Sequence, residues 1–178
     1  AYSNSSHGFD VSFCCTVSDC TSTYNTLSGF NLSTKCAISA STAQHNSENG
    51  IVASTHSRVT GCGAAGNKSD GIRVAANTAV LDCAGSDNGA ANNGAGLHAT
   101  GSDNRIEGNN MTGNNRGFDV DSGGNYIVRN TASGNNPNWD IVTNNVCLVV
   151  SAAAGGAIYG NSGGTAPGST DPHVNFTY

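Results

Sequence analysis

Residues 50–74 read GIVASTHSRVTGCGAAGNKSDGIRV, and this stretch decides the fold. It opens with a glycine and a bulky apolar residue, and it returns to the same pair 21 residues later, at Gly71-Ile72. The same phase holds Gly8-Phe9, Gly29-Phe30, Gly96-Leu97 and Gly117-Phe118, and Asn138-Trp139 continues it. Successive pairs lie 21, 21, 21, 25, 21 and 21 residues apart. A period this regular predicts one structural unit stacked on copies of itself.

Each repeat carries apolar residues two positions apart, such as Ile72 and Val74, which places both side chains on one face of a strand. Twenty-one residues are too few for a strand and a crossover helix, but they suit three short strands joined by turns. Parallel crossovers are right-handed in about 98% of cases. The sequence therefore predicts an all-β fold, a single-stranded right-handed parallel β-helix of about seven coils over residues 1–150. A non-repeating tail over residues 151–178 is expected to cap the rod or to contact another subunit.

Two stretches carry a resemblance to a known family: residues 104–120, NRIEGNNMTGNNRGFDV, and residues 124–135, GNYIVRNTASGN. Over about residues 4–150 the chain resembles the right-handed parallel β-helix repeat family, which shares the pectate-lyase-like superfold. The resemblance implies the fold but no single activity, because the family holds lyases, hydrolases, epimerases, tailspikes and adhesins.

Composition excludes several classes of function. Only 11% of the 178 residues are charged, the formal net charge is -5, and no Lys/Arg cluster exists to neutralise phosphates, so we expect no nucleic-acid partner. No run of 18 apolar residues occurs, so we expect no membrane span. The chain begins Ala1-Tyr2, and Asn4 has the phase of later repeat positions. We therefore expect a segment that starts inside a coil of a longer protein.

Repeated small and polar residues have a structural interpretation. Asn25, Asn46, Asn67 and Asn88 share one turn phase and predict an asparagine ladder, and the recurring glycine predicts a sharp turn before each strand. Two inward positions hold cysteine: Cys20, Cys62 and Cys83 share one, with Ser41, Asn109 and Asn130 on its other rungs, and Cys15 and Cys36 share the second. This phase predicts a ladder of small side chains. Disulfides between Cys15 and Cys36 or between Cys62 and Cys83 remain open on distance, whereas zinc is disfavoured because no C-x-x-C occurs.

Functional residues are expected on the outward side of the strands. The position between the two bulky residues gives an outward row, which reads Asp10, Asn31, Val52, Arg73, His98, Asp119 and Asp140. Arg73, His98, Asp119 and Asp140 are the candidate catalytic residues, with His98 or Arg73 as a base or as the charge that neutralises an acidic sugar. Asp119, Asp121 and Asp140 are candidate ligands for Ca²⁺, which prefers oxygen. Outward strand positions must be polar in any case, so a structural reading of the row also stands.

The sequence favours a non-catalytic, extracytoplasmic β-helix segment of a larger surface or secreted protein, which serves as a rigid scaffold or binds carbohydrate. The nearly minimal coils and the scarcity of aromatic residues support it. Possible partners are a polysaccharide and two further copies of the chain in a homotrimer. The alternative is a polysaccharide lyase or epimerase that uses the outward Arg/His/Asp residues. An ice- or mineral-binding face ranks last, because no outward row is consistently threonine. Asp171-Pro172-His173 resembles the Asp-Pro-His of alginate epimerases, but it lies in the tail and is not taken as a site.

Overall fold

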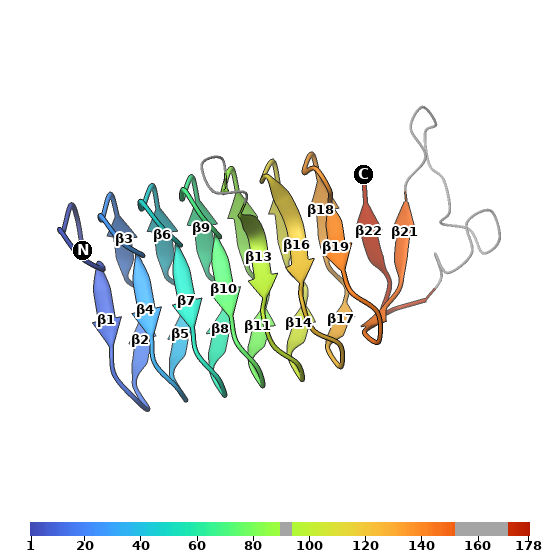
Figure 1. The fold of residues 1–178 in the computed structure, drawn as a ribbon, viewed down its shortest axis with the longest axis horizontal. Helices are drawn as coiled ribbons and strands as arrows, with labels where there is room; N and C mark the ends of the chain where they lie inside the picture. The colour runs from blue at the N-terminus through green and yellow to red at the C-terminus, as the bar shows by residue number, and fades with distance from the viewer. Residues whose placement is uncertain (90–93, 152–170) are drawn as a thin grey trace.

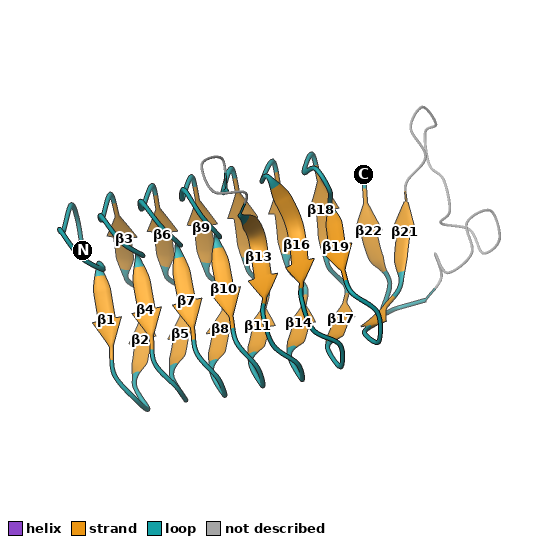
Figure 2. Ribbon diagram, in the orientation of Figure 1, coloured by secondary structure: helices purple, strands orange, loops and turns teal. Residues whose placement is uncertain are grey.

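The computed structural model describes residues 1–89, 94–151 and 171–178 as a rod built from short strands. Figure 2 shows strands and connecting turns, with no helix in these residues. It follows that no helix in the described residues is long and apolar enough to cross a membrane. The strands form three parallel sheets that run along the rod (Figure 1).

The first sheet, on the face turned to the viewer in Figure 1, carries the predicted outward row. Its strands are β1 (Phe9–Val11), β4 (Phe30–Leu32), β7 (Ile51–Ala53), β10 (Ile72–Val74), β13 (Ala95–Ala99), β16 (Arg116–Val120) and β19 (Trp139–Ile141). The second sheet comprises β2 (Thr16–Ser18), β5 (Ala37–Ser39), β8 (Arg58–Thr60), β11 (Ala79–Leu81), β14 (Arg105–Glu107), β17 (Tyr126–Val128) and β20 (Val146–Cys147). The third comprises β3 (Thr21–Thr23), β6 (Thr42–Gln44), β9 (Gly63–Ala65), β12 (Ala84–Ser86), β15 (Asn110–Thr112), β18 (Thr131–Ser133), β22 (Asn175–Thr177) and β21 (Val149–Ser151).

Six turns of the rod take one strand from each sheet in chain order, from β1-β2-β3 to β16-β17-β18. In the seventh, β19 and β20 are followed in the third sheet by β22 from the chain end, which pairs with β18 on one side and β21 on the other. The predicted parallel β-helix is confirmed. About seven coils were expected; the structure has six complete turns and a seventh whose third strand comes from the chain end. Residues 152–170 of the predicted tail lie outside the described residues, and its capping or subunit-contact role stays a prediction.

Strand register follows the glycine repeat. Ile51 pairs with Ile72 and Ile72 with Leu97, so the side chains of equivalent residues stack along the rod. These three side chains are fully buried. The stack ends in aromatic pairs, Phe9 on Phe30 and Phe118 on Trp139, with ring centroids 4.9 and 4.5 Å apart. The apolar half of the repeat thus forms one continuous core inside the coil.

Each turn has three corners, and every corner combines a left-handed residue with an inward polar or thiol side chain. The left-handed residue comes first, as in Tyr24 (φ 56°) before Asn25 and Asp82 (φ 53°) before Cys83. The inward side chain then accepts the backbone N–H of the equivalent residue in the preceding coil: Asn46 N–H and Nδ2–H both donate to Asn67 Oδ1, at 3.0 and 2.9 Å. This ladder runs through Asn4, Asn25, Asn46, Asn67, Asn88, Asn114, Asn135 and Asn138, so the predicted asparagine ladder is present.

The recurring glycine has a different cause from the predicted sharp turn. Gly29 and Gly50 do not adopt positive φ. A Cβ on Gly29 would instead lie 2.7 Å from Asn46 Nδ2 and 2.7 Å from the carbonyl oxygen of Gly50. Glycine is required because the asparagine ladder and the next coil approach the backbone closely, so the turn explanation is wrong.

Five of the seven cysteines lie in the predicted ladders, and all seven are free thiols. Cys36, Cys62 and Cys83 are buried, whereas Cys15 is exposed and Cys20 half-buried because no described coil covers the first turn. The sulfur atoms also accept corner N–H groups, for example Cys62 N–H to Cys83 Sγ at 3.4 Å. The thiols of Cys36 and Cys83 therefore accept the N–H that an asparagine oxygen accepts elsewhere, and they also pack as small apolar side chains.

Candidate acid–base site

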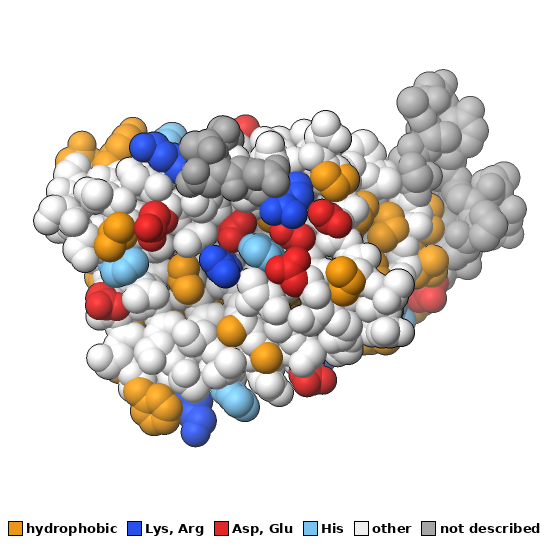
Figure 3. Space-filling model, in the orientation of Figure 1, with side chains coloured by type: hydrophobic (Ala, Val, Ile, Leu, Met, Phe, Trp, Pro, Cys, Tyr) orange, Lys and Arg blue, Asp and Glu red, His pale blue; other side chains and the backbone are white. Residues whose placement is uncertain are grey.

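The outward row lies on adjacent strands, in the predicted order. Arg73 of β10 pairs with His98 of β13, His98 with Asp119 of β16, and Asp119 with Asp140 of β19. Asp121 follows β16 directly. Figure 3 shows acidic, basic and histidine side chains gathered on this face over β10, β13 and β16. Neighbouring strands of a sheet lie about 4.8 Å apart, so these side chains are within reach of one another.

His98 is held from both sides by carboxylates. Its Nδ1–H donates to Asp70 Oδ2 at 2.9 Å, and its Nε2–H donates to Asp121 Oδ2 at 3.0 Å. Asp119 Oδ2 lies 3.6 Å from the same Nε2. Asp70 is buried, with a side chain 7% exposed, whereas the side chain of Asp121 is 55% exposed. The imidazole is therefore held at Nδ1 by a buried carboxylate and contacts an exposed carboxylate at Nε2.

Asp70 was not among the predicted site residues. It precedes Gly71 at the corner that leads into β10, and its Oδ1 accepts the N–H of Ala95 at 2.8 Å. That bond ties Asp70 to the first residue of β13, the strand that carries His98. The residues directly before the repeated glycines form a row of their own, in which Asp70 is the equivalent of Asn49 one coil earlier. Nothing in that row indicates contact with His98.

The carboxylates around His98 control its charge. Burial alone would lower the pKa of His98, but the hydrogen bonds to Asp70 and Asp121 and the charges of Asp70 and Asp119 raise it, from 6.5 to about 9. His98 is therefore an imidazolium at neutral pH. In this state both ring nitrogens donate, as the two short contacts require.

Arg116 is the second residue that the sequence analysis missed. Its Nη1 lies 2.7 Å from Asp119 Oδ2 and 3.4 Å from Asp140 Oδ2. Burial raises the pKa of Asp119, although the charges of His98 and Arg116 act in the opposite direction. Strict alternation along β16 places Arg116 on the same side as the inward Phe118, so the pattern that located Asp119 pointed away from Arg116.

Arg73 stands apart from this network. Within the described residues it forms no ion pair, and its side chain is exposed on β10. It lines a surface hollow of about 280 Å³ together with Val52, Ser54 and Thr100. The structure thus places all the predicted site residues on one face, but it joins only His98, Asp119, Asp121 and Asp140 through ionic contacts, with Asp70 and Arg116 added.

Three side chains have the geometry of a metal-binding group. The ligand atoms of His98, Asp119 and Asp121 lie within 4.8 Å of one another. The predicted Ca²⁺ ligands were Asp119, Asp121 and Asp140, whereas Asp140 contacts Arg116. Ca²⁺ takes oxygen ligands, and one corner of this triangle is a protonated imidazole nitrogen, so the arrangement fits Ca²⁺ poorly. The Ca²⁺ site stays a prediction.

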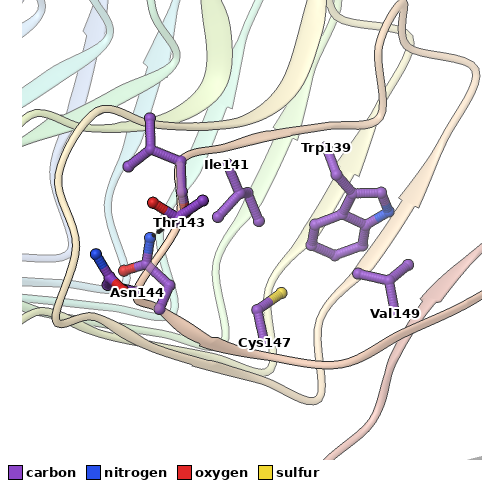
Figure 4. Close-up of a pocket in the computed structure, with 8 residues that line it drawn as sticks. Trp139, Ile141, Thr143, Asn144, Cys147 and Val149 are labelled. Carbon is purple, nitrogen blue, oxygen red and sulfur yellow. Dashed lines mark hydrogen bonds between the residues drawn. The ribbon is translucent and has the colours of Figure 1, made fainter.

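A separate cavity of about 300 Å³ lies beside Trp139, Ile141, Asn144, Cys147 and Val149 (Figure 4). The described residues that line it include no acidic or basic side chain. Burial raises the pKa of the Cys147 thiol to about 11, which keeps it protonated at neutral pH. This cavity therefore lacks the groups that acid–base catalysis requires.

Asp171-Pro172-His173 forms a local turn. His173 N–H donates to Asp171 Oδ1 at 2.8 Å, and both side chains are about half exposed. The turn leads into β22, away from the outward row.

Comparison with known proteins supports the fold. The sequence matches no family model and no curated protein. A solved structure, the A-module of mannuronan C-5 epimerase AlgE4 from Azotobacter vinelandii, is similar with a TM-score of 0.60 and 24% sequence identity. The match covers 67% of this chain and 36% of that one, so the chain spans well under half of the epimerase module. The chain therefore has the fold of a right-handed parallel β-helix.

Proposed function

We propose that this face of the rod acts on a polysaccharide by general acid–base chemistry, as a lyase. The observation that carries the proposal is the His98 imidazole, fixed by Asp70 at Nδ1 and hydrogen-bonded to Asp121 at Nε2. A buried carboxylate behind a histidine sets its orientation and stabilises its charged form. The outer partner, Asp121, is exposed and can meet a substrate.

Asp121 and the Nε2–H of His98 supply both proton transfers of an elimination on a uronate sugar. Asp121 takes the proton from C5, the electron pair forms the C4–C5 double bond, and the C4–O4 bond breaks. His98 Nε2–H gives its proton to the departing O4. The proton on Asp121 then passes to Nε2 across their 3.0 Å contact, which restores both groups.

The same geometry favours elimination over epimerisation. Epimerisation removes a proton from one face of the sugar ring and returns one on the opposite face, so the two groups must flank the ring. Asp121 and His98 are hydrogen-bonded to each other on one surface. An acid and a base on one side of the sugar suit a syn elimination, in which the proton and the leaving oxygen depart from the same face of the ring.

The remaining charges have supporting roles. Arg116 pairs with Asp119, whose carboxylate lies near Nε2 and favours the imidazolium. The similar epimerase module acts on mannuronan, a polysaccharide, which makes a polysaccharide substrate reasonable for this face. An extracytoplasmic location and assembly as a homotrimer remain part of the proposal.

The test is incubation of the chain with oligouronates in D₂O. A lyase yields products with an unsaturated terminal sugar, detected by ultraviolet absorbance and mass spectrometry, without deuterium at C5 of the intact sugars. Deuterium at C5 without chain cleavage would indicate epimerisation instead. Absence of both reactions, with the fold verified by circular dichroism, would contradict an enzymatic function.

The second candidate is a non-catalytic scaffold that binds carbohydrate. The short coils favour it, since the strands of the first two turns have only three residues each. Binding of oligouronates without turnover would support this alternative.

A further inference from the structure

Arg73 differs from three other arginines of this molecule, which contact acidic groups. Arg116 pairs with Asp119 and Asp140, and Arg105 and Arg129 both pair with Glu107. Arg73 has no ionic partner in the described part of the chain, although it pairs in register with His98. A cation next to a group of carboxylates, without a bond to any of them, is available for an external anion.

The surroundings of Arg73 suit a sugar. The hollow of about 280 Å³ beside it has an apolar side, Val52, and two hydroxyl side chains, Ser54 and Thr100. Thr100 Oγ1 donates to the carbonyl oxygen of Val74 at 3.1 Å, so its lone pairs remain available as acceptors. A pyranose offers the matching groups, with apolar C–H faces and hydroxyl donors around its edge.

We propose that Arg73 binds the carboxylate of a uronate residue in this hollow, and so makes the face specific for acidic polysaccharides. The subsite lies one strand away, about 4.8 Å, on the β7 side of His98. A guanidinium accepts a carboxylate through two parallel hydrogen bonds, which gives both affinity and orientation. This inference rests on the proposed function for its place beside the reacting sugar, but it concerns binding and is tested separately.

The charge balance of the face explains why a specific cation is needed. Asp70, Asp119, Asp121 and Asp140 contribute four carboxylates, against the imidazolium of His98 and the guanidinium of Arg116. An acidic polymer would be repelled by this surplus of negative charge. Arg73 is the group that offsets the repulsion on the side where the hollow lies.

The experiment measures binding by calorimetry for oligogalacturonate and oligomannuronate, each beside its carboxyl-reduced counterpart. Arg73→Gln is expected to weaken binding of an oligouronate by about 10- to 100-fold, the effect of losing a charge-assisted hydrogen bond, and to leave the carboxyl-reduced sugar unchanged. Arg73→Lys should retain part of the affinity. Arg58→Gln, on an exposed residue of β8 in the second sheet, is the matched control and should change nothing.

The outcomes separate this inference from the proposed function. Loss of oligouronate affinity in Arg73→Gln supports the subsite even if the wild-type chain shows no turnover, in which case only the lyase proposal falls. Equal weakening for acidic and carboxyl-reduced sugars would overturn the inference, and so would the absence of oligouronate binding by the wild-type chain.

Discussion

The first three turns and the later four share one interior but present different outward rows. Inside, Phe30, Ile51, Ile72 and Leu97 form one buried stack that crosses the boundary without a change. Outside, Asp10 and Asn31 form a single exposed hydrogen bond at 2.9 Å, and Val52 carries no charge. From His98 onward the row contacts buried Asp70 and half-buried Arg116 and forms an ionic network. The buried core therefore specifies the coil, whereas the residues of the outward row can change from coil to coil and form a functional site.

The largest expected effect comes from a substitution of His98, in the charged part of the outward row. His98→Gln removes the proton donor, and turnover of an oligouronate should fall by about 10²- to 10⁴-fold, the usual contribution of a general acid or base. The measurement is kcat for unsaturated product. Asp10→Asn, in the same row of the first turn, is the control and should retain full activity. A His98→Gln chain that keeps its turnover would remove His98 from the mechanism.

A second prediction tests whether the interior is alike in both halves. Asn46→Ala in the second turn and Asn114→Ala in the fifth each remove a buried acceptor of two hydrogen bonds from the preceding coil. Each should lower the free energy of unfolding by about 1–3 kcal/mol, because a buried N–H is left without an acceptor. Chemical denaturation measures both values. Costs that differ widely between the two variants would show that the turns are not equivalent inside.

The smallest expected effect concerns pH. The pKa of His98 in the fold is about 9, above its value of 6.5 in the unfolded chain. The stabilisation from its charged form is therefore complete below pH 6.5 and is lost as the pH rises through about 9. Asp70→Asn removes one cause of the raised pKa, so this variant should show a lower His98 pKa by NMR titration and a smaller loss of unfolding free energy over the same interval.

Asp10→Asn again serves as the control for pH, because Asp10 lies on the first turn and does not contact His98. An unchanged His98 pKa in Asp70→Asn would mean that Asp70 does not hold the imidazole in solution.

The 21-residue period of the repeat and the alternation of side chains along a strand were enough to predict the outward row. A strand alternates its side chains with period two, and a repeat of fixed length returns the same side to every coil, so Arg73, His98, Asp119 and Asp140 had to share one face. Asp121 followed by the same alternation. The repeat could not explain the glycines correctly, because their cause is the approach of Asn46 and Gly50 to Gly29, which only the packing of adjacent coils reveals.

The sequence by itself determined the stacking of the coils, the identity of the core and ladder residues, and the face on which charges gather, since all of these depend on local period. Only the tertiary structure decided which charges meet. Asp70 reaches His98 from a corner, where side-chain direction depends on how one coil leads into the next, and Arg116 reaches Asp119 against the alternation of its own strand. The directions of these two side chains do not follow the alternation of a strand, and so the two residues that organise the site became visible only in the fold.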